Sequence, residues 1–198
     1  MAMENASPAS DSLRMLESLG PLPEPAARPF FVAVSGLPGT GKSYFCHKLV
    51  ERLPVVLLES DALRKMLFEA HAYSAEESAH LFRAIHALIE RLLSKGMSVV
   101  LDATNLSEHN REYLYSIYSI ADRLSVKLTL VRVSAPAGVV RERLEKRQAA
   151  RSGKSDADWE VYQKMKTSAE EICRKHFTMD TSRDISPAID MVVREALR

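Results

Sequence analysis

The stretch FFVAVSGLPGTGKS, residues 30–43, contains a run of apolar residues followed by three glycines, a lysine and a serine. The apolar run has the length and composition of a buried strand, and the glycine that follows predicts a turn. The helical pattern KSYFCHKLVERL, residues 42–53, begins within the same stretch. Strand, glycine-rich turn and helix therefore follow one another without a gap, which is the context that a phosphate-binding loop requires.

The turn satisfies the pattern GxxxxGK followed by Ser or Thr, which defines a phosphate-binding loop, or P-loop. Glycines allow several N–H groups to point inward, and the helix beginning near Lys42 adds the positive end of its dipole. A polyphosphate is the expected ligand: we expect Lys42 to reach its β- and γ-phosphates and the Ser43 hydroxyl to coordinate Mg²⁺. The alternative is a plain glycine-rich turn with a solvated Lys42. The predicted nucleotide-binding residues here are Gly36, Leu37, Pro38, Gly39, Thr40, Gly41, Lys42, Ser43 and Tyr44.

Short β-rich runs alternate with longer helical patterns from residue 30 onward, which indicates right-handed βαβ crossovers. The predicted strands are FFVAVS (30–35), VVLLES (55–60), SVVLDA (98–103), KLTLVRVS (127–134) and HFTMD (176–180). The predicted fold class is therefore α/β, a three-layer P-loop NTPase fold. Its five-stranded, mostly parallel sheet is flanked by helices and carries a helical lid.

Composition and charge limit the possible partners of the chain. Its 198 residues are 46% hydrophobic, which suits one domain at 29–198, and the net charge of +1 creates no overall field for nucleic acid or membranes. Residues 1–28 are rich in Pro, Ser, Ala and Glu and predict a disordered arm, in which Leu13, Leu16 and Leu19 could form one docking turn. Neither a leader pattern nor a long apolar run is visible, so we expect a cytoplasmic protein without membrane association.

Two cysteines, Cys46 and Cys173, lie in amphipathic helical patterns and are expected to be buried, reduced thiols. Trp159 and Tyr162 lie three residues apart in the helical pattern after the basic segment and are expected to pack that helix on the core; stacking on the acceptor is the alternative.

The P-loop alone does not distinguish a switch, a motor or a transferase. The chain has neither an Asn-Lys-x-Asp guanine-reading motif nor an ABC signature, and it is short for a motor with an added domain. These observations favour a small kinase.

The second strand leads into SDALRKMLF, which places Asp61 at the carboxyl edge of the sheet and Arg64 one helical turn later. In a kinase of hydroxyl groups, an aspartate here can accept the proton of the acceptor, and an arginine can bind an anionic group of the acceptor. The alternative is that Asp61 caps the following helix while Arg64 is solvated.

The third strand ends in DATN, and Asp102 suits the role of a Walker B aspartate that holds Mg²⁺, together with Ser43. An aspartate bonded to N–H groups of the neighbouring loop is the alternative. Asn105 and Arg111 follow; contact with the acceptor and a plain surface position are equally compatible with the sequence.

Residues 141–154 read RERLEKRQAARSGK, with six basic and two acidic residues, and lie within a predicted lid at about 141–157. Arg143 and Arg147 are four residues apart and share a helix face, so both guanidinium groups could close over the transferring phosphates. An exposed helix with Arg–Glu pairs is the alternative.

Together, GLPGTGKS, SDALRKMLF, VVLDATN, RERLEKR and FTMDTS resemble a family of small P-loop kinases. This family groups polynucleotide 5′-hydroxyl kinases with zeta-toxin-like and predicted ATP-binding (AAA-type) kinases. The resemblance covers residues 30–198. It implies that Asp61 is the general base, that Arg64 binds an acceptor phosphate, and that Arg143 and Arg147 form the lid. It also implies that Thr181 and Ser182 lie near the adenine, which could pack on Arg143.

We therefore expect an ATP- and Mg²⁺-dependent kinase of a hydroxyl acceptor, with a polynucleotide 5′-end as the leading specific acceptor. A nucleotide, a nucleotide-sugar or another small metabolite remains an open acceptor, because no basic groove is visible outside the lid. A nucleotide-binding module without transfer activity is the alternative from another class. The sequence leaves the oligomeric state open.

Overall fold

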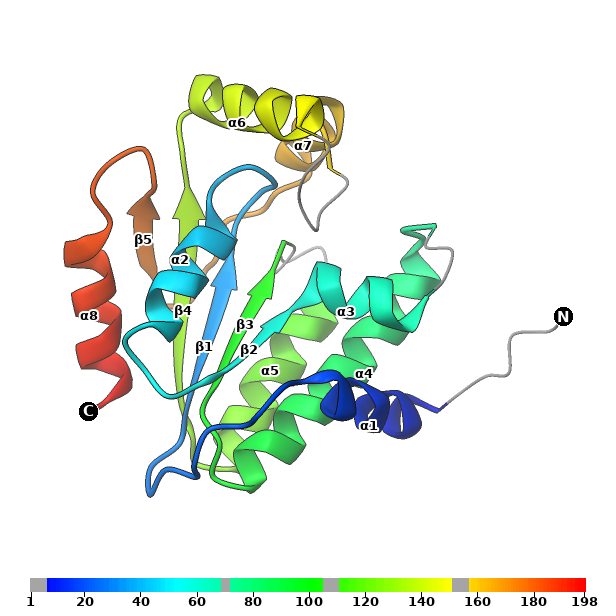
Figure 1. The fold of residues 1–198 in the computed structure, drawn as a ribbon, viewed down its shortest axis with the longest axis vertical. Helices are drawn as coiled ribbons and strands as arrows, with labels where there is room; N and C mark the ends of the chain where they lie inside the picture. Colours follow the sequence, from blue (N-terminus) through cyan, green and yellow to red (C-terminus); the bar gives the residue numbers. More distant parts are fainter. Residues whose placement is uncertain (1–6, 69–71, 105–110, 151–156) are drawn as a thin grey trace, which may run out of the picture.

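The computed structural model describes residues 7–68, 72–104, 111–150 and 157–198 and places one parallel five-stranded sheet at the centre (Figure 1). The strand order is β2-β3-β1-β4-β5, and every pair of neighbouring strands is parallel. This arrangement confirms the predicted α/β fold. The strands are β1 (Phe30–Ser35), β2 (Val56–Glu59), β3 (Val99–Ala103), β4 (Lys127–Ser134) and β5 (Phe177–Asp180).

Helices cover both faces of the sheet and extend above its carboxyl edge (Figure 1). They are α1 (Pro8–Ser18), α2 (Lys42–Val50), α3 (Ser60–Leu67), α4 (Ala75–Ser94), α5 (Arg111–Arg123), α6 (Ala137–Ala149), α7 (Trp159–Thr167) and α8 (Ser186–Ala196). Helices α2 and α8 pack on one face, and α3, α4 and α5 pack on the other. Helices α6 and α7 lie beyond the carboxyl ends of the strands, and α6 contains the first part of the segment predicted to be a lid.

The central strand β1 separates two hydrophobic layers. Phe31 and Ala33 contribute to the layer beneath α3, α4 and α5, whereas Val32 and Val34 contribute to the layer beneath α2 and α8. Both faces of β1 are buried, which explains its nearly continuous apolar sequence.

Helix α1 differs from the disordered arm predicted for residues 1–28. Ser7 caps this helix, and its Met15 side chain is fully buried against the layer beneath α4. The Asp11 carboxylate, which is also buried, lies 2.6 Å from His80 Nε2 on α4. The docking expected from the leucine spacing extends over three helical turns, because burial of one apolar stripe stabilises a helix that a proline-rich composition does not favour.

The two cysteines have different environments. Cys46 is buried on α2, as predicted, and burial raises the pKa of its thiol well above the usual value. Cys173 is exposed in the connection between α7 and β5, so the expected buried helical position is wrong for this residue. Among the described helices, none combines the length and the apolar character that a membrane crossing requires.

Candidate active site

The P-loop connects β1 to α2 and turns on two glycines with left-handed backbone conformations. Gly39 and Gly41 have φ values of 76° and 90°, a region that residues with a Cβ atom rarely adopt. A Cβ atom on Gly41 would also lie 2.9 Å from Thr181 Oγ1, and one on Gly36 would lie 2.3 Å from the Val133 carbonyl oxygen. The glycines therefore meet both a conformational and a steric requirement.

Lys42 is the first residue of α2, and its side chain is buried within the curl of the loop. Its Nζ donates a hydrogen bond to the Leu37 carbonyl oxygen at 3.2 Å. Burial lowers the pKa of Lys42, while the negative charges of Asp102 and Asp61 act in the opposite direction. A polyphosphate at this position would supply the negative charge that a buried ammonium group lacks.

Ser43 and Asp102 meet across the gap between α2 and β3. The Ser43 hydroxyl donates a hydrogen bond to Asp102 Oδ2 at 2.6 Å. Burial raises the pKa of Asp102, and the neighbouring Lys42 ammonium opposes that shift. A hydroxyl and a carboxylate at this separation are oxygen ligands that suit Mg²⁺, which takes few protein ligands and keeps several waters. The pair therefore fits the predicted magnesium position.

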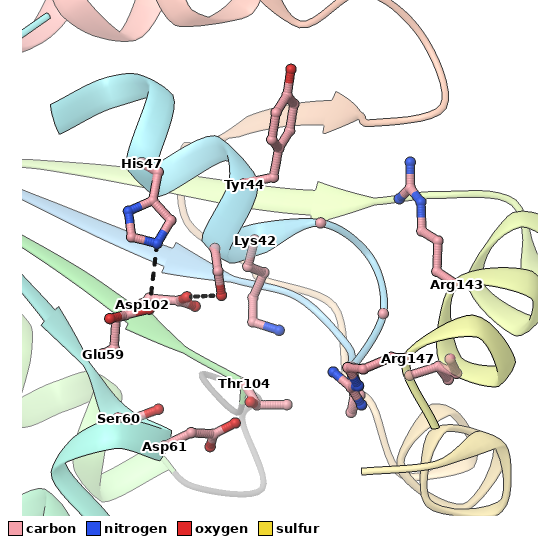
Figure 2. Close-up of a pocket in the computed structure, with 15 residues that line it drawn as sticks. Lys42, Tyr44, His47, Glu59, Ser60, Asp61, Asp102, Thr104, Arg143 and Arg147 are labelled. Atoms are coloured by element: carbon pink, nitrogen blue, oxygen red, sulfur yellow. Dashed lines mark hydrogen bonds and ion pairs between the residues drawn. The ribbon is translucent and has the colours of Figure 1, made fainter. Parts of the chain in front are cut away.

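A cavity of about 410 Å³ unites these groups at the carboxyl edge of the sheet (Figure 2). Figure 2 shows the Lys42 side chain extending toward the middle of the cavity, with Asp61 and Thr104 on one side and Arg147 on another. The lining residues are Pro38, Gly39, Gly41, Lys42, Ser43, Tyr44, His47, Glu59, Ser60, Asp61, Asp102, Thr104, Arg143, Leu144 and Arg147.

Asp61 lies in the first turn of α3 and lines the cavity. The capping position of this helix is occupied by Glu59, so Asp61 is not the N-cap that the alternative interpretation required. Within the described part of the chain, no hydrogen bond or ion pair engages the Asp61 carboxylate. Its charge acts on Lys42, which places both groups in one electrostatic environment.

Arg64 is only 7% exposed and does not line this cavity. Its guanidinium forms an ion pair with Glu77 on α4, donates a 3.1 Å hydrogen bond to Ser78 Oγ and lies 5.0 Å from the centre of the Tyr73 ring. Asp61 and Arg64 were expected to share a helix face. Instead, the structure turns Asp61 toward the P-loop and Arg64 toward α4.

The Glu77 carboxylate is the centre of this network. Burial opposes its ionisation, but hydrogen bonds from the Ala72 N–H and from Arg64 outweigh that effect and lower the pKa of Glu77. The capping hydrogen bond from the Glu77 N–H to Ser74 Oγ, 3.1 Å long, is also present at the start of α4.

Arg143 and Arg147, the two arginines predicted for the lid, both line the cavity, and each donates a hydrogen bond to a main-chain oxygen. Arg143 donates to Thr181 Oγ1 and to the Thr181 carbonyl oxygen, each at 2.8 Å. Arg147 donates to the carbonyl oxygen of Ala157, beyond the lid helix α6. Thr181 is buried and donates to the Thr40 carbonyl oxygen at 2.5 Å, so it joins Arg143 of α6 to the P-loop.

Several lining residues were not predicted. Glu59 is the last residue of β2 and Ser60 follows it, His47 lies one turn into α2 with its Nε2 at 3.7 Å from Glu59 Oε1, and Thr104 follows β3. A position at the end of a strand was the available signal for all except His47. Asn105 lies outside the described residues, as does part of the predicted lid, and the side chain of Arg111 on α5 is not described.

A family model described as AAA domain matches residues 31–172. This chain belongs to that family. The part of this AAA-domain protein that matches begins in β1 and ends in the connection before β5, so α1 lies outside it. Among curated proteins, no sequence is significantly similar to the chain.

Solved structures share the fold of this AAA-domain protein at low sequence identity. APS kinase CysC of Mycobacterium tuberculosis, in complex with AMPPNP and APS, has a TM-score of 0.63 and 18% identity over 88% of this chain and 100% of its own. A gluconokinase of Sinorhizobium meliloti has a TM-score of 0.59 and 23% identity over 85% and 90%. Kti12 of Chaetomium thermophilum, in complex with ADP-AlF3, has a TM-score of 0.62 and 19% identity over 84% and 98%.

Proposed function

We propose that this protein is a Mg²⁺-dependent kinase that transfers the γ-phosphoryl group of ATP to a hydroxyl group of a small molecule. The observation that carries this proposal is the cavity in which Lys42, the Ser43–Asp102 pair and the Asp61 carboxylate, which no other described residue engages, lie together. Two lid arginines line the same cavity. These are the parts that phosphoryl transfer requires: charge neutralisation, a metal position and a group that orients the nucleophile.

The residues divide the chemistry among them. Main-chain N–H groups of the P-loop and Lys42 hold the phosphates, while Arg143 and Arg147 neutralise charge that develops during transfer. Ser43 and Asp102 would hold Mg²⁺, which screens the phosphate charge when bound. Asp61 orients the acceptor hydroxyl and takes its proton as the new O–P bond forms and the bond between the γ-phosphorus and the β–γ bridging oxygen breaks.

A small acceptor is favoured over a polynucleotide 5′-end. The polynucleotide interpretation depends on Arg64 as the ligand of an acceptor phosphate, but this guanidinium is already engaged by Glu77 and Ser78. Binding a long strand also requires several phosphate contacts, for which the sequence offers no basic groove outside the lid. Two proteins of similar structure are named as kinases of small molecules, APS kinase and gluconokinase.

The test is transfer from γ-labelled ATP to a panel of oligonucleotide 5′-hydroxyls, nucleosides, sugars, sugar acids and phospho-sugars. Asp61→Asn should reduce kcat by about 100-fold or more, because a positioned base contributes at least that much. Its affinity for a fluorescent ATP analogue should not change, because Asp61 is proposed to act on the acceptor. Asp122→Asn on the exposed surface of α5 is the matched control and should leave both values unchanged.

A nucleotide-binding module without transfer activity is the competing function. It would bind the ATP analogue, label no acceptor in the panel and show the same slow ATP hydrolysis in the wild type and in Asp61→Asn. Transfer to any acceptor that depends on Asp61 would exclude it.

A further inference from the structure

A second cavity, of about 400 Å³, lies next to the P-loop on the face of the sheet that carries α5. Its floor is formed by Ser35 at the end of β1 together with Arg132 and Ser134 on β4. Tyr162 and Lys166 on α7 line it from the lid side. This volume is within the range of sites for small molecules.

The two cavities adjoin where phosphoryl transfer would take place. Thr104 lines both of them. Leu37 lines the second cavity, and its carbonyl oxygen accepts the hydrogen bond from the Lys42 ammonium, which extends toward the middle of the first (Figure 2). Since Lys42 is expected to reach the γ-phosphate, a molecule in the second cavity would lie beside the group that is transferred.

Arg132 is the unusual residue of the second cavity. It alternates along β4 with Val131 and Val133, which face α2 and α8, so its side chain lies on the same face as Leu130. Arg132 is half-buried, and no hydrogen bond or ion pair engages its guanidinium within the described part of the chain. A partly desolvated guanidinium is stabilised by an anion, and it binds carboxylates and phosphates through paired hydrogen bonds.

The remaining walls suit a molecule with hydroxyl groups. The Tyr162 ring is buried beneath the cavity, and the Lys166 ammonium lies 6.0 Å from its centre. Glu170 and Glu171 are exposed residues of the lining. Their carboxylates can accept hydrogen bonds from hydroxyl groups and would repel a second anionic group. One anionic group near Arg132 and hydroxyl groups elsewhere therefore match this cavity.

We propose that the second cavity is the acceptor subsite and that the acceptor is a small polyhydroxylated molecule with one anionic group bound by Arg132. The anionic group is a carboxylate or a phosphate ester. This inference rests on the proposed kinase function, but it assigns a binding site that can be measured without turnover.

The fluorescence of Trp159 provides that measurement. This is the single tryptophan of the chain, and its ring is stacked on Tyr162 with the ring centres 4.9 Å apart. Binding is followed with saturating Mg·AMPPNP, which occupies the P-loop and prevents anions from binding there. The three probes are gluconate, glucose 6-phosphate and glucose, which carry a carboxylate, a phosphate ester and no charge.

At least one of the two anionic probes should bind the wild type with a Kd about 10-fold or more below that of glucose. Arg132→Gln should raise that Kd by about 10- to 100-fold, because it removes a charge-assisted hydrogen-bond donor. Arg132→Lys should have an intermediate effect. Arg194→Gln, an exposed arginine on α8, is the matched control and should behave as the wild type. Lys166→Gln, at an exposed position, should weaken the binding of the same probe several-fold. This variant provides the test if Arg132→Gln does not fold.

Equal binding of all three probes, or binding that is unaffected by Arg132→Gln, would overturn the subsite. Transfer that depends on Asp61 would then leave the kinase function standing. Conversely, binding that depends on Arg132 without phosphorylation of any acceptor in the panel would support the anion site and reject the kinase function.

Discussion

The nucleotide side of this AAA-domain protein, built around the P-loop, and its proposed acceptor side, where α3 carries Asp61, are held in place by different means. On the nucleotide side, main-chain groups dominate: two glycines with positive φ shape the P-loop, and Thr181 joins the loop to the lid through carbonyl and hydroxyl hydrogen bonds. On the acceptor side, side chains dominate. Arg64 on α3 is bound to Glu77 on α4, and α1 packs against both helices.

This difference indicates which side can change without loss of the other. Main-chain geometry depends on a few glycines and tolerates few substitutions, whereas an ion pair or an added helix can be replaced one residue at a time. Helix α1 lies outside the residues that match the family model, yet it covers the helix pair that carries Asp61. The proposed acceptor specificity can therefore diverge on a constant ATP site.

The largest effect is expected from a substitution that disrupts the nucleotide side alone. Lys42→Met should lower kcat/KM for phosphoryl transfer by about 1000-fold, because a buried ammonium aimed at the phosphates is removed. Affinity for the ATP analogue should also fall, while probe binding through Arg132 persists. Lys48→Met, which removes an exposed lysine of α2 paired with Glu51, is the control and should retain activity. An active Lys42→Met enzyme would contradict the assigned role of the P-loop.

The next largest effect is expected from a substitution that disrupts the proposed acceptor side. Glu77→Gln leaves the buried Arg64 guanidinium without its carboxylate, which should lower the free energy of unfolding by about 3 kcal/mol. Urea denaturation measures this loss. Where the variant remains folded, kcat for transfer should fall, because α3 carries Asp61, while the affinity for the ATP analogue stays unchanged. Glu76→Gln, at the exposed neighbouring position, should be neutral. A loss of ATP affinity equal to the loss in kcat would show that the two sides are not separate.

The smallest effect is a pH dependence within α4. Burial lowers the pKa of His86 from 6.5 to about 4. Between these two pH values the unfolded chain therefore binds a proton on His86 while the folded chain does not. The contribution of neutral His86 to the free energy of unfolding is complete above pH 6.5 and falls as the pH decreases. The loss between pH 7.5 and pH 5 should be about 2 kcal/mol. Subtracting the pH dependence of His86→Leu from that of the wild type isolates this contribution; identical profiles would contradict it.

The local parts of the site were predictable because their chemistry lies within one short segment. The spacing of Gly36, Gly41, Lys42 and Ser43 predicts the P-loop, and the alternation of apolar runs and helical patterns predicts the sheet. Asp61 and Asp102 were found because each lies at the carboxyl end of a predicted strand, and parallel strands bring their carboxyl ends to one edge.

Other features could not be read from spacing. Asp61 and Arg64 are three residues apart, but α4 supplies Glu77 as a buried partner and draws the guanidinium away from the cavity. The docking of α1 depends on an apolar surface of α4 that exists only after the sheet has formed. Arg132 was overlooked because a basic residue in a strand carries no motif, and its cavity arises from β1, β4 and α7 together.

The sequence by itself predicted the order of the functional groups along the chain: a loop for phosphate, a carboxylate for the acceptor, a carboxylate for the metal and arginines for a lid. Tertiary structure alone decided which of these charges are paired and which are available to ligands. The physical reason is that pairing and desolvation depend on distances between side chains from separate elements, and packing sets those distances.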